Sequence, residues 1–261
     1  MDVTLPQYRV YGSGDLTLFV LHGAYGDGRY FEDFATHMAE NGYRVVVWDC
    51  PGYGESAPVS PPTIERFAEA AMAMIQAEAT TTNVLLGHSM GALIGPYVAN
   101  RMTRINGLIL SAGSRGFAAR TPEDQAQYMK DRLAPIENGM SVEDYARPMI
   151  RSMMAKGSTG PQVDRVFEVV LAMKTETFAT SIRAIGAYDG RPALEALKTP
   201  TLMIAGRADP ACTAAGMQLM HEMVAGSEFH VIENAGHYGF AEQPQEYRQL
   251  VLDFLASPKF A

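Results

Sequence analysis

The segment Gly87-His88-Ser89-Met90-Gly91 holds a serine between two glycines, a spacing that suits an enzymatic nucleophile. It follows the apolar run Val84–Leu86 and precedes the helical stretch Ala92–Met102. A tight turn from a strand into a helix needs small residues two positions before and after the serine, because larger side chains would clash there. Such a turn holds the hydroxyl clear of the sheet, with the N-terminus of the helix directed at it. We therefore predict that Ser89 is a nucleophile.

A serine hydroxyl needs a base before it can attack, and the usual base is a histidine that a carboxylate orients. Six histidines compete for this role: His22, His37, His88, His221, His230 and His237. Five of them flank the serine, end a strand-like run or lie within a helical or strand-like stretch. His237 alone lies in a loop just after a late strand-like run, and we predict that it is the base.

Asp209 is the predicted acid, because it lies in the loop after the strand-like run Thr201–Ala205. In enzymes whose serine lies on such a strand-to-helix turn, the acid follows the serine and precedes the histidine along the chain. The other usual position follows Leu110, where Ser111–Ser114 contains no carboxylate. Asp189 is an alternative, but it lies before the strand-like run and not after it.

The stretch His22-Gly23-Ala24 ends the strand-like run Leu16–Leu21. A glycine at this point allows the backbone to come close to the nucleophile. The amides of Ala24 and Met90 could then both stabilise a developing oxyanion. A simple turn at the end of a strand is the alternative reading of these residues.

The elements that must position these residues follow from the hydrophobic pattern. Six short apolar runs recur along the chain: Leu16–Leu21, Arg44–Trp48, Val84–Leu86, Ile105–Leu110, Thr201–Ala205 and Phe229–Ile232. Several are apolar at nearly every position, which is typical of parallel strands that helices cover on both faces. Stretches between them, such as Ile64–Ile75 and Tyr247–Leu255, have one apolar helical face. The pattern predicts a doubly wound α/β sheet.

This alternation stops between Phe117 and Ala187, where we expect only short helices, over residues 122–136, 142–154, 162–173 and 177–187. We predict a core domain of residues 1–116 and 188–261, with residues 117–187 as a helical cap over the nucleophile. Methionine lines adaptable apolar surfaces. The expected substrate contacts are two methionines of the cap and two tyrosines beside the catalytic loops: Met153, Met154, Tyr25 and Tyr238.

The composition limits the classes of function. The 261 residues carry a net charge of −8, which argues against binding to a nucleic acid backbone. Two cysteines and an N-terminus without a signal sequence predict a cytoplasmic protein, and no apolar run is long enough to cross a membrane. No spaced cluster of histidines and cysteines predicts a metal, and no GxGxxG motif after a strand predicts a dinucleotide cofactor. A small-molecule substrate is the expected partner, and the oligomeric state stays open.

Taken together, five motifs resemble those of α/β-hydrolase fold enzymes. They are HG at 22–23, DxPGxGxS at 49–56, GHSMG at 87–91, GRADP at 206–210 and NAGHxxxxEQP at 234–244. The resemblance implies a mostly parallel, doubly wound sheet with a helical cap inserted after the sixth strand. It also implies a triad of Ser89, Asp209 and His237, an oxyanion hole made by the amides of Ala24 and Met90, and no cofactor.

Within that family, residues 200–213 and the ending NAGHYGFAEQP look similar to 3-oxoadipate enol-lactonases and related esterases. The expected function is hydrolysis of an ester or lactone of a small carboxylic substrate. Hydrolases that cleave carbon–carbon bonds of meta-cleavage products share the GxSMG pattern, but they usually have tryptophan after the catalytic histidine, where Tyr238 stands here. A ligand receptor that keeps the triad is a further alternative.

Overall fold

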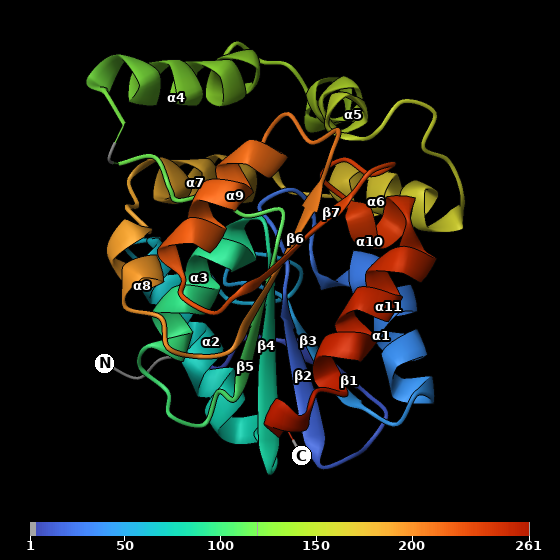
Figure 1. Cartoon of the computed structure of the whole chain (residues 1–261). Helices are drawn as coiled ribbons and strands as arrows, with labels where there is room; N and C mark the ends of the chain where they lie inside the picture. The colour runs from blue at the N-terminus through green and yellow to red at the C-terminus, as the bar shows by residue number, and fades with distance from the viewer. Residues whose placement is uncertain (1–3, 119, 261) are drawn as a thin grey trace.

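A single twisted sheet forms the centre of the molecule, in a computed structural model that describes residues 4–118 and 120–260 (Figure 1). In these residues the sheet has seven strands, in the spatial order β1-β3-β2-β4-β5-β6-β7. The strands are β1 (Tyr8–Tyr11), β2 (Leu16–Leu21), β3 (Arg44–Trp48), β4 (Thr82–His88), β5 (Gly107–Ser111), β6 (Thr201–Gly206) and β7 (Glu228–Ile232). Only β1 runs antiparallel to its neighbour, β3, which confirms the mostly parallel sheet.

The register brings the carboxyl ends of the central strands together. Gly87 of β4 pairs with Leu21 of β2 on one side and with Leu110 of β5 on the other. Each of these strands therefore ends beside the point where Ser89 leaves the sheet. In open α/β sheets the crevice outside the carboxyl ends of the strands is where ligands bind.

Helices cover both faces of the sheet, as the continuous apolar strands require. Helices α1 (Glu32–Glu40) and α11 (Pro244–Leu255) lie on one side (Figure 1). The other side carries α2 (Ile64–Glu78), α3 (Met90–Ala99), α8 (Arg191–Glu195) and α9 (Ala214–Met223). Their apolar stripes face inward: Ile64, Phe67 and Ala71 of α2 are buried. Three short helical segments complete these layers: η1 (Gly28–Phe31), α10 (Gly239–Glu242) and η2 (Pro258–Phe260).

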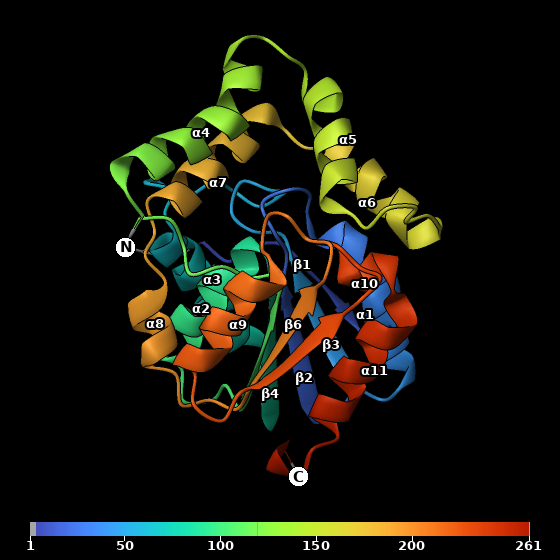
Figure 2. The same cartoon turned by 45° about the horizontal axis from the view of Figure 1, so that its top comes forward.

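Four further helices lie above the carboxyl ends of the strands, and we call them the inserted helices (Figure 2). They are α4 (Pro122–Glu137), α5 (Val142–Met153), α6 (Pro161–Leu171) and α7 (Thr175–Gly186), close to the ranges that the sequence predicts. Side-chain caps start two of them: Thr121 accepts from the amide of Asp124 at 3.2 Å and Ser141 accepts from that of Asp144 at 3.0 Å. Figure 2 shows α4 beside α7 and α5 beside α6, with the strand ends below.

The family resemblance implied that the cap follows the sixth strand, and this position is wrong: the inserted helices follow the fifth strand, β5. The sheet begins with a single antiparallel edge strand, so one strand fewer precedes the insertion than the resemblance implied. Both ends of the insertion meet at its base, where Gly116 and Asp189 form an isolated bridge. Within the described ranges, no helix is long and apolar enough to cross a membrane.

Candidate active site

Ser89 lies at the sharp turn between β4 and α3, in a backbone conformation that is uncommon for a residue with a side chain (φ 55°, ψ −110°). Its amide donates to the carbonyl of Ser111 at 2.9 Å, which fixes the turn to the neighbouring strand. A Cβ atom on Gly87 would lie 2.2 Å from the carbonyl oxygen of Gly91, and one on Gly91 would lie 2.3 Å from that of Leu21. Both glycines of the GHSMG motif are therefore required by close backbone contacts.

Asp209 and His237 form a buried pair, with 2.7 Å between Asp209 Oδ2 and His237 Nδ1. The other carboxylate oxygen of Asp209 accepts hydrogen bonds from the amides of Ala211 at 2.8 Å and Cys212 at 3.0 Å. These bonds fix the carboxylate in the loop after β6. The amide of His237 donates to the carbonyl of Met153 at 2.8 Å, so the loop after β7 is held from the side of the inserted helices.

The pair perturbs the pKa of both groups. Burial disfavours the charged imidazole, but the Asp209 carboxylate attracts it and accepts its hydrogen bond, so the pKa of His237 is raised above its ordinary value of 6.5. Burial also opposes the charge on Asp209, but the His237 ring and two backbone amides more than offset this and lower the pKa of that carboxyl. An ionised aspartate that holds Nδ1–H leaves Nε2 free to accept a proton.

His88 is a second buried imidazole, with its ring centroid 5.0 Å from that of His237. Burial lowers the pKa of His88 well below 6.5, and the nearby rings of His237 and His22 lower it further. His88 is therefore neutral and packs among aromatic rings, including Tyr30 and Phe240. This surrounding gives His88 a packing role.

A cavity of about 50 Å³ lies between the strand ends and the inserted helices. Its lining includes four of the residues with predicted catalytic or oxyanion roles: Ser89, His237, Ala24 and Met90. Of the four predicted substrate contacts, Tyr25 and Met153 line the cavity, and Tyr238 and Met154 do not. Tyr238 is buried instead, with its ring at 5.7 Å from that of His88 and 6.2 Å from that of Tyr30.

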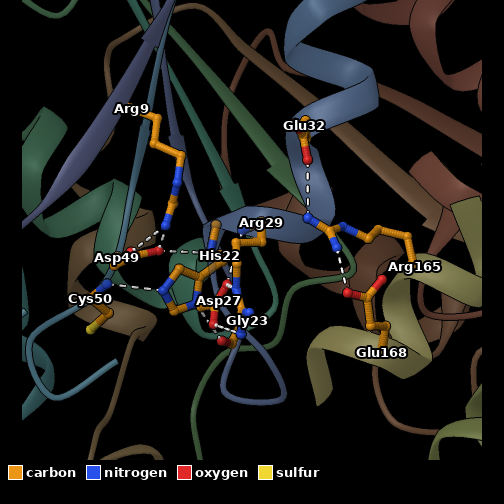
Figure 3. A network of polar contacts seen from close by, with 11 residues as sticks. Arg9, His22, Gly23, Asp27, Arg29, Glu32, Asp49, Cys50, Arg165 and Glu168 are labelled. Carbon is orange, nitrogen blue, oxygen red and sulfur yellow. Dashed lines mark hydrogen bonds and ion pairs between the residues drawn. The ribbon is translucent and has the colours of Figure 1, made fainter. Parts of the chain in front are cut away.

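The loop that carries Gly23 and Ala24 is held by a network that starts at His22 (Figure 3). His22 Nδ1 lies 2.7 Å from the carbonyl oxygen of Gly23, and His22 Nε2 accepts from the amide of Cys50 at 2.9 Å. Because Nε2 accepts a hydrogen bond, the proton of the neutral ring resides on Nδ1 and is donated to Gly23. In the HG motif, His22 therefore holds the loop in place, and Gly23 allows the loop to come close to Ser89.

Two tyrosine hydroxyls complete the support of this loop. The hydroxyl of Tyr30 accepts from the amide of Gly23 at 2.8 Å. The hydroxyl of Tyr53 donates to the carbonyl of Ala24 at 2.9 Å and lies 2.7 Å from the hydroxyl of Ser181 on α7. The two tyrosines thereby bond one amide and one carbonyl of the loop, and His22 bonds the carbonyl of Gly23. In the described part of the chain, neither the Ala24 amide nor the Met90 amide donates to a protein acceptor, which leaves both available to an oxyanion.

The DxPGxGxS segment acts as a framework. Asp49 is buried and binds both terminal nitrogens of Arg9, at 3.1 and 3.0 Å (Figure 3). The Ser56 hydroxyl donates to the carbonyl of Asp49 at 2.6 Å. A cavity of about 500 Å³ opens beside these residues, but neither Ser89 nor His237 lines it. Two of its three acidic residues, Asp49 and Asp27, are paired with arginines, and the smaller cavity, which Ser89 and His237 line, is the better candidate for catalysis.

Glu242 connects the His237 loop to the inserted helices. Its Oε1 accepts from the amides of Gly236 and Tyr238, each at 3.0 Å. Its Oε2 accepts from the amide of Ala155 and the hydroxyl of Ser158, each at 2.7 Å. One buried carboxylate therefore holds the loop after β7 and the segment between α5 and α6 together.

Sequence reasoning did not identify Tyr30, Tyr53 and Glu242 as parts of the site. Tyr53 and Glu242 lie inside the motifs DxPGxGxS and NAGHxxxxEQP, and the motif is the only signal that could have marked them. Tyr30 lies in no motif, and only the tertiary structure brings its hydroxyl to Gly23.

Comparisons with known proteins show the family of the chain. The alpha/beta hydrolase family matches residues 18–250 of the chain. The chain is 29% identical, over 95% of its length and 89% of that protein's, to a 2-hydroxy-6-oxononadienedioate/2-hydroxy-6-oxononatrienedioate hydrolase of Escherichia coli.

Two solved structures show the same fold. An esterase from Exiguobacterium antarcticum has a TM-score of 0.85 at 23% identity, and the aligned region covers 96% of this chain and 95% of the esterase chain. The enol-lactonase from Burkholderia xenovorans has a TM-score of 0.80 at 22% identity, with 96% of each chain covered. With the family match over most of the sequence, the chain belongs to the alpha/beta hydrolase family.

Proposed function

We propose that this hydrolase is a serine enzyme that cleaves an ester or lactone of a small carboxylic substrate. The observation that carries the proposal is that Ser89 and the Asp209-supported His237 face one cavity. His237 accepts the Ser89 proton as Ser89 Oγ attacks the substrate carbonyl, and the amides of Ala24 and Met90 stabilise the oxyanion. His237 then protonates the leaving alcohol, and water resolves the acyl-enzyme by the same steps.

The size and charge of the cavity support this substrate class. Its volume of about 50 Å³ is small, since typical ligand pockets measure roughly 300–1,000 Å³. A small acyl group suits this space better than a long one. Arg132 also lines the cavity, and in the described residues its guanidinium has no carboxylate partner and lies over the ring of Tyr128. A substrate carboxylate is the natural partner for such a charge.

Residues 117–187 serve in this proposal as a cap that closes the cavity from above. Several of their side chains reach its wall, among them Phe117, Tyr128, Met153 and Ile182. The cap would exclude water from the acyl-enzyme and select the substrate by shape. A cytoplasmic location fits the two free cysteines, Cys50 and Cys212.

Carbon–carbon bond hydrolysis is a second candidate, which the Escherichia coli relative favours because its name describes a dienoic diacid substrate. Arg132 would suit a carboxylate of such a substrate equally well. The small cavity and the tyrosine at position 238 favour the ester or lactone reading.

A direct comparison of substrates tests the proposal. Purified protein is given p-nitrophenyl acetate, a small lactone and a 2-hydroxy-6-oxodienoic acid, and turnovers per chain are counted. Many turnovers of the ester or lactone support the proposal, and preferential cleavage of the dienoic acid supports the second candidate. One turnover per chain would indicate a receptor.

Ser89→Ala tests the assignment of the nucleophile, and it should lower kcat by roughly 10³-fold or more with the fold unchanged. A serine-directed phosphonate should label Ser89 alone in the wild-type protein. Labelling at another residue would refute the assignment of the nucleophile.

A further inference from the structure

Cys212 lies beside the Asp209–His237 pair and completes a cluster of three potential metal ligands. A carboxylate oxygen of Asp209, the Cys212 sulfur and a ring nitrogen of His237 all lie within 4.8 Å of one another. Asp209 and His237 are buried and Cys212 is partly buried, so these groups are held in place. The sequence does not reveal this cluster, because His237 comes from a different loop, after another strand.

The three groups are the ligand types that zinc and cadmium prefer. A thiolate, an imidazole and a carboxylate supply three protein ligands and two negative charges, which leaves the fourth tetrahedral position open. Binding would release the Cys212 thiol proton to solvent, since the thiolate is the ligand, and it would also release the second proton of any His237 ring that is protonated, since the ligating nitrogen must carry no proton.

A metal bound through Asp209 Oδ2 and His237 Nδ1 cannot coexist with the present hydrogen bond of the pair. The 2.7 Å between Asp209 Oδ2 and His237 Nδ1 is shorter than the separation of two ligands on one tetrahedral ion. With metal–ligand bonds of about 2.0 Å that separation is about 3.3 Å. A bound ion that used these two atoms would therefore break the bond that orients His237, and one that used Nε2 would occupy the base itself.

The cluster borders the surface of the molecule through Cys212. Cys212 lines an open surface cavity of about 160 Å³, and Ala211 and Ser114 line both this cavity and the one beside Ser89. The Cys212 loop is thus the wall between the two spaces. Three arginines also line the outer cavity, so the binding energy would come from the three inner ligands and not from the entrance.

We propose that Cys212, Asp209 and His237 form an inhibitory site for a soft divalent cation such as Zn²⁺ or Cd²⁺. Occupation of the site takes the acid and the base away from Ser89, and removal of the ion restores them. The protein would then be a hydrolase whose activity falls as free zinc rises, through the thiol of Cys212.

Metal binding is measured first, without reference to activity. Cd²⁺ is titrated into the full chain while the ultraviolet charge-transfer band of the cadmium–thiolate bond is followed, and equilibrium dialysis gives the number of ions per chain. The wild type, Ser89→Ala and Cys50→Ala should each bind one ion with the band. Cys212→Ser should lack the band, and His237→Ala should bind more weakly. Because Ser89→Ala is included, the result is independent of whether the proposed hydrolase activity is found.

Inhibition is measured second, with each variant compared with its own rate in EDTA. Zn²⁺ should inhibit the wild type, and EDTA should restore the rate. The concentration for half-inhibition should rise roughly 100-fold or more in Cys212→Ser, since loss of even an outer-shell partner lowers metal affinity about 10- to 100-fold.

Three results would overturn the proposal. They are the absence of a cadmium–thiolate band in the wild type, a band that persists in Cys212→Ser, and affinity that is unchanged in His237→Ala. Circular dichroism confirms that each variant is folded, and Cys212→Ala provides a second test of the same thiol.

Discussion

Gly23 faces Ser89 so closely that a Cβ atom on Gly23 would lie 2.8 Å from Ser89 Cβ and 3.3 Å from Ser89 Oγ. Two separate segments, the end of β2 and the turn after β4, thus meet at Ser89. The parallel pairing of β2 with β4 sets this approach, since Leu21 and Gly87 are partners in the register. The positions of the predicted oxyanion donor Ala24 and of the predicted nucleophile Ser89 therefore depend on one contact.

Gly23→Ala should reduce kcat/KM of the ester by about 100-fold, because the added methyl group must displace Ser89 or the oxyanion loop, and misplacement by about 1 Å costs on this order. Steady-state kinetics with p-nitrophenyl acetate measure the change. Gly216→Ala is the control, since it adds the same group in α9, where the nearest atom is the Thr213 hydroxyl at 3.2 Å. Full activity in Gly23→Ala would show that the loop does not contribute to catalysis.

Asp209→Asn should lower kcat by about 10⁴-fold, by analogy with serine-protease triads, because the amide favours the wrong imidazole tautomer. The pH profile gives a second test, measured in EDTA. His237 must be neutral to act as a base, so activity should rise with pH through its pKa, which lies above 6.5 in the wild type. Without the carboxylate, the largest influence that raises the pKa is lost; burial still lowers the pKa and only the weaker effect of Cys212 opposes it, so the midpoint of the residual activity should move to lower pH.

The control for this prediction is Asp189→Asn, which changes the alternative acid. Asp189 is paired with Arg191 at 2.9 Å, at the base of the insertion, so this variant should keep both the rate and the midpoint. A normal rate in Asp209→Asn would exclude Asp209 as the acid of the triad.

Tyr53→Phe should lower kcat about 10-fold with little change in KM. The variant leaves the buried carbonyl of Ala24 without its hydrogen bond, and an unsatisfied group of this kind costs about 1–3 kcal/mol. Thermal unfolding measured in parallel reports any general loss of stability. Tyr43→Phe removes a hydroxyl from the segment before β3 and should leave kcat unchanged; an equal fall in both variants would contradict the positioning role.

Arg132→Met should reduce kcat/KM for an ester that bears a free carboxylate by about 10- to 100-fold, since a hydrogen bond to a charged group contributes about 1.5–3 kcal/mol. A neutral ester of similar size should be affected much less. Arg147→Met is the matched control, because Arg147 is an exposed arginine of α5. Equal losses on both esters would mean that Arg132 packs against the cavity wall and does not bind the carboxylate.

The strands that carry the site could be predicted because their sequences are apolar without interruption. Val84–Leu86 and Thr201–Ala205 both lie inside parallel strands, and the residues predicted from the loops after them, Ser89 and Asp209, lie at the same end of the sheet. Strand β1 was not predicted, because its four residues are half-exposed or exposed and show neither a continuous apolar run nor a clear alternation.

The contacts around the catalytic loops could not be predicted in the same way. Hydrophobic periodicity places Met153 and Met154 on one helix but does not say which of them faces the cavity; the structure places Met153 there. The Tyr53–Ala24 and Tyr30–Gly23 hydrogen bonds depend on the mutual placement of separate loops, for which one sequence has no periodic signal. The same reason hid the approach of Cys212 to His237.

The four hydrogen bonds of Glu242 have a consequence for the design of chimeric enzymes. A chimera that takes its inserted helices from another hydrolase would replace Ala155 and Ser158, while Glu242 and the loop of His237 stay behind. A mismatched graft would leave one carboxylate oxygen buried without its donors, and the strain would fall on the loop of His237. The unit that can be exchanged between relatives is therefore discontinuous in sequence, and position 242 must be transferred together with the helices.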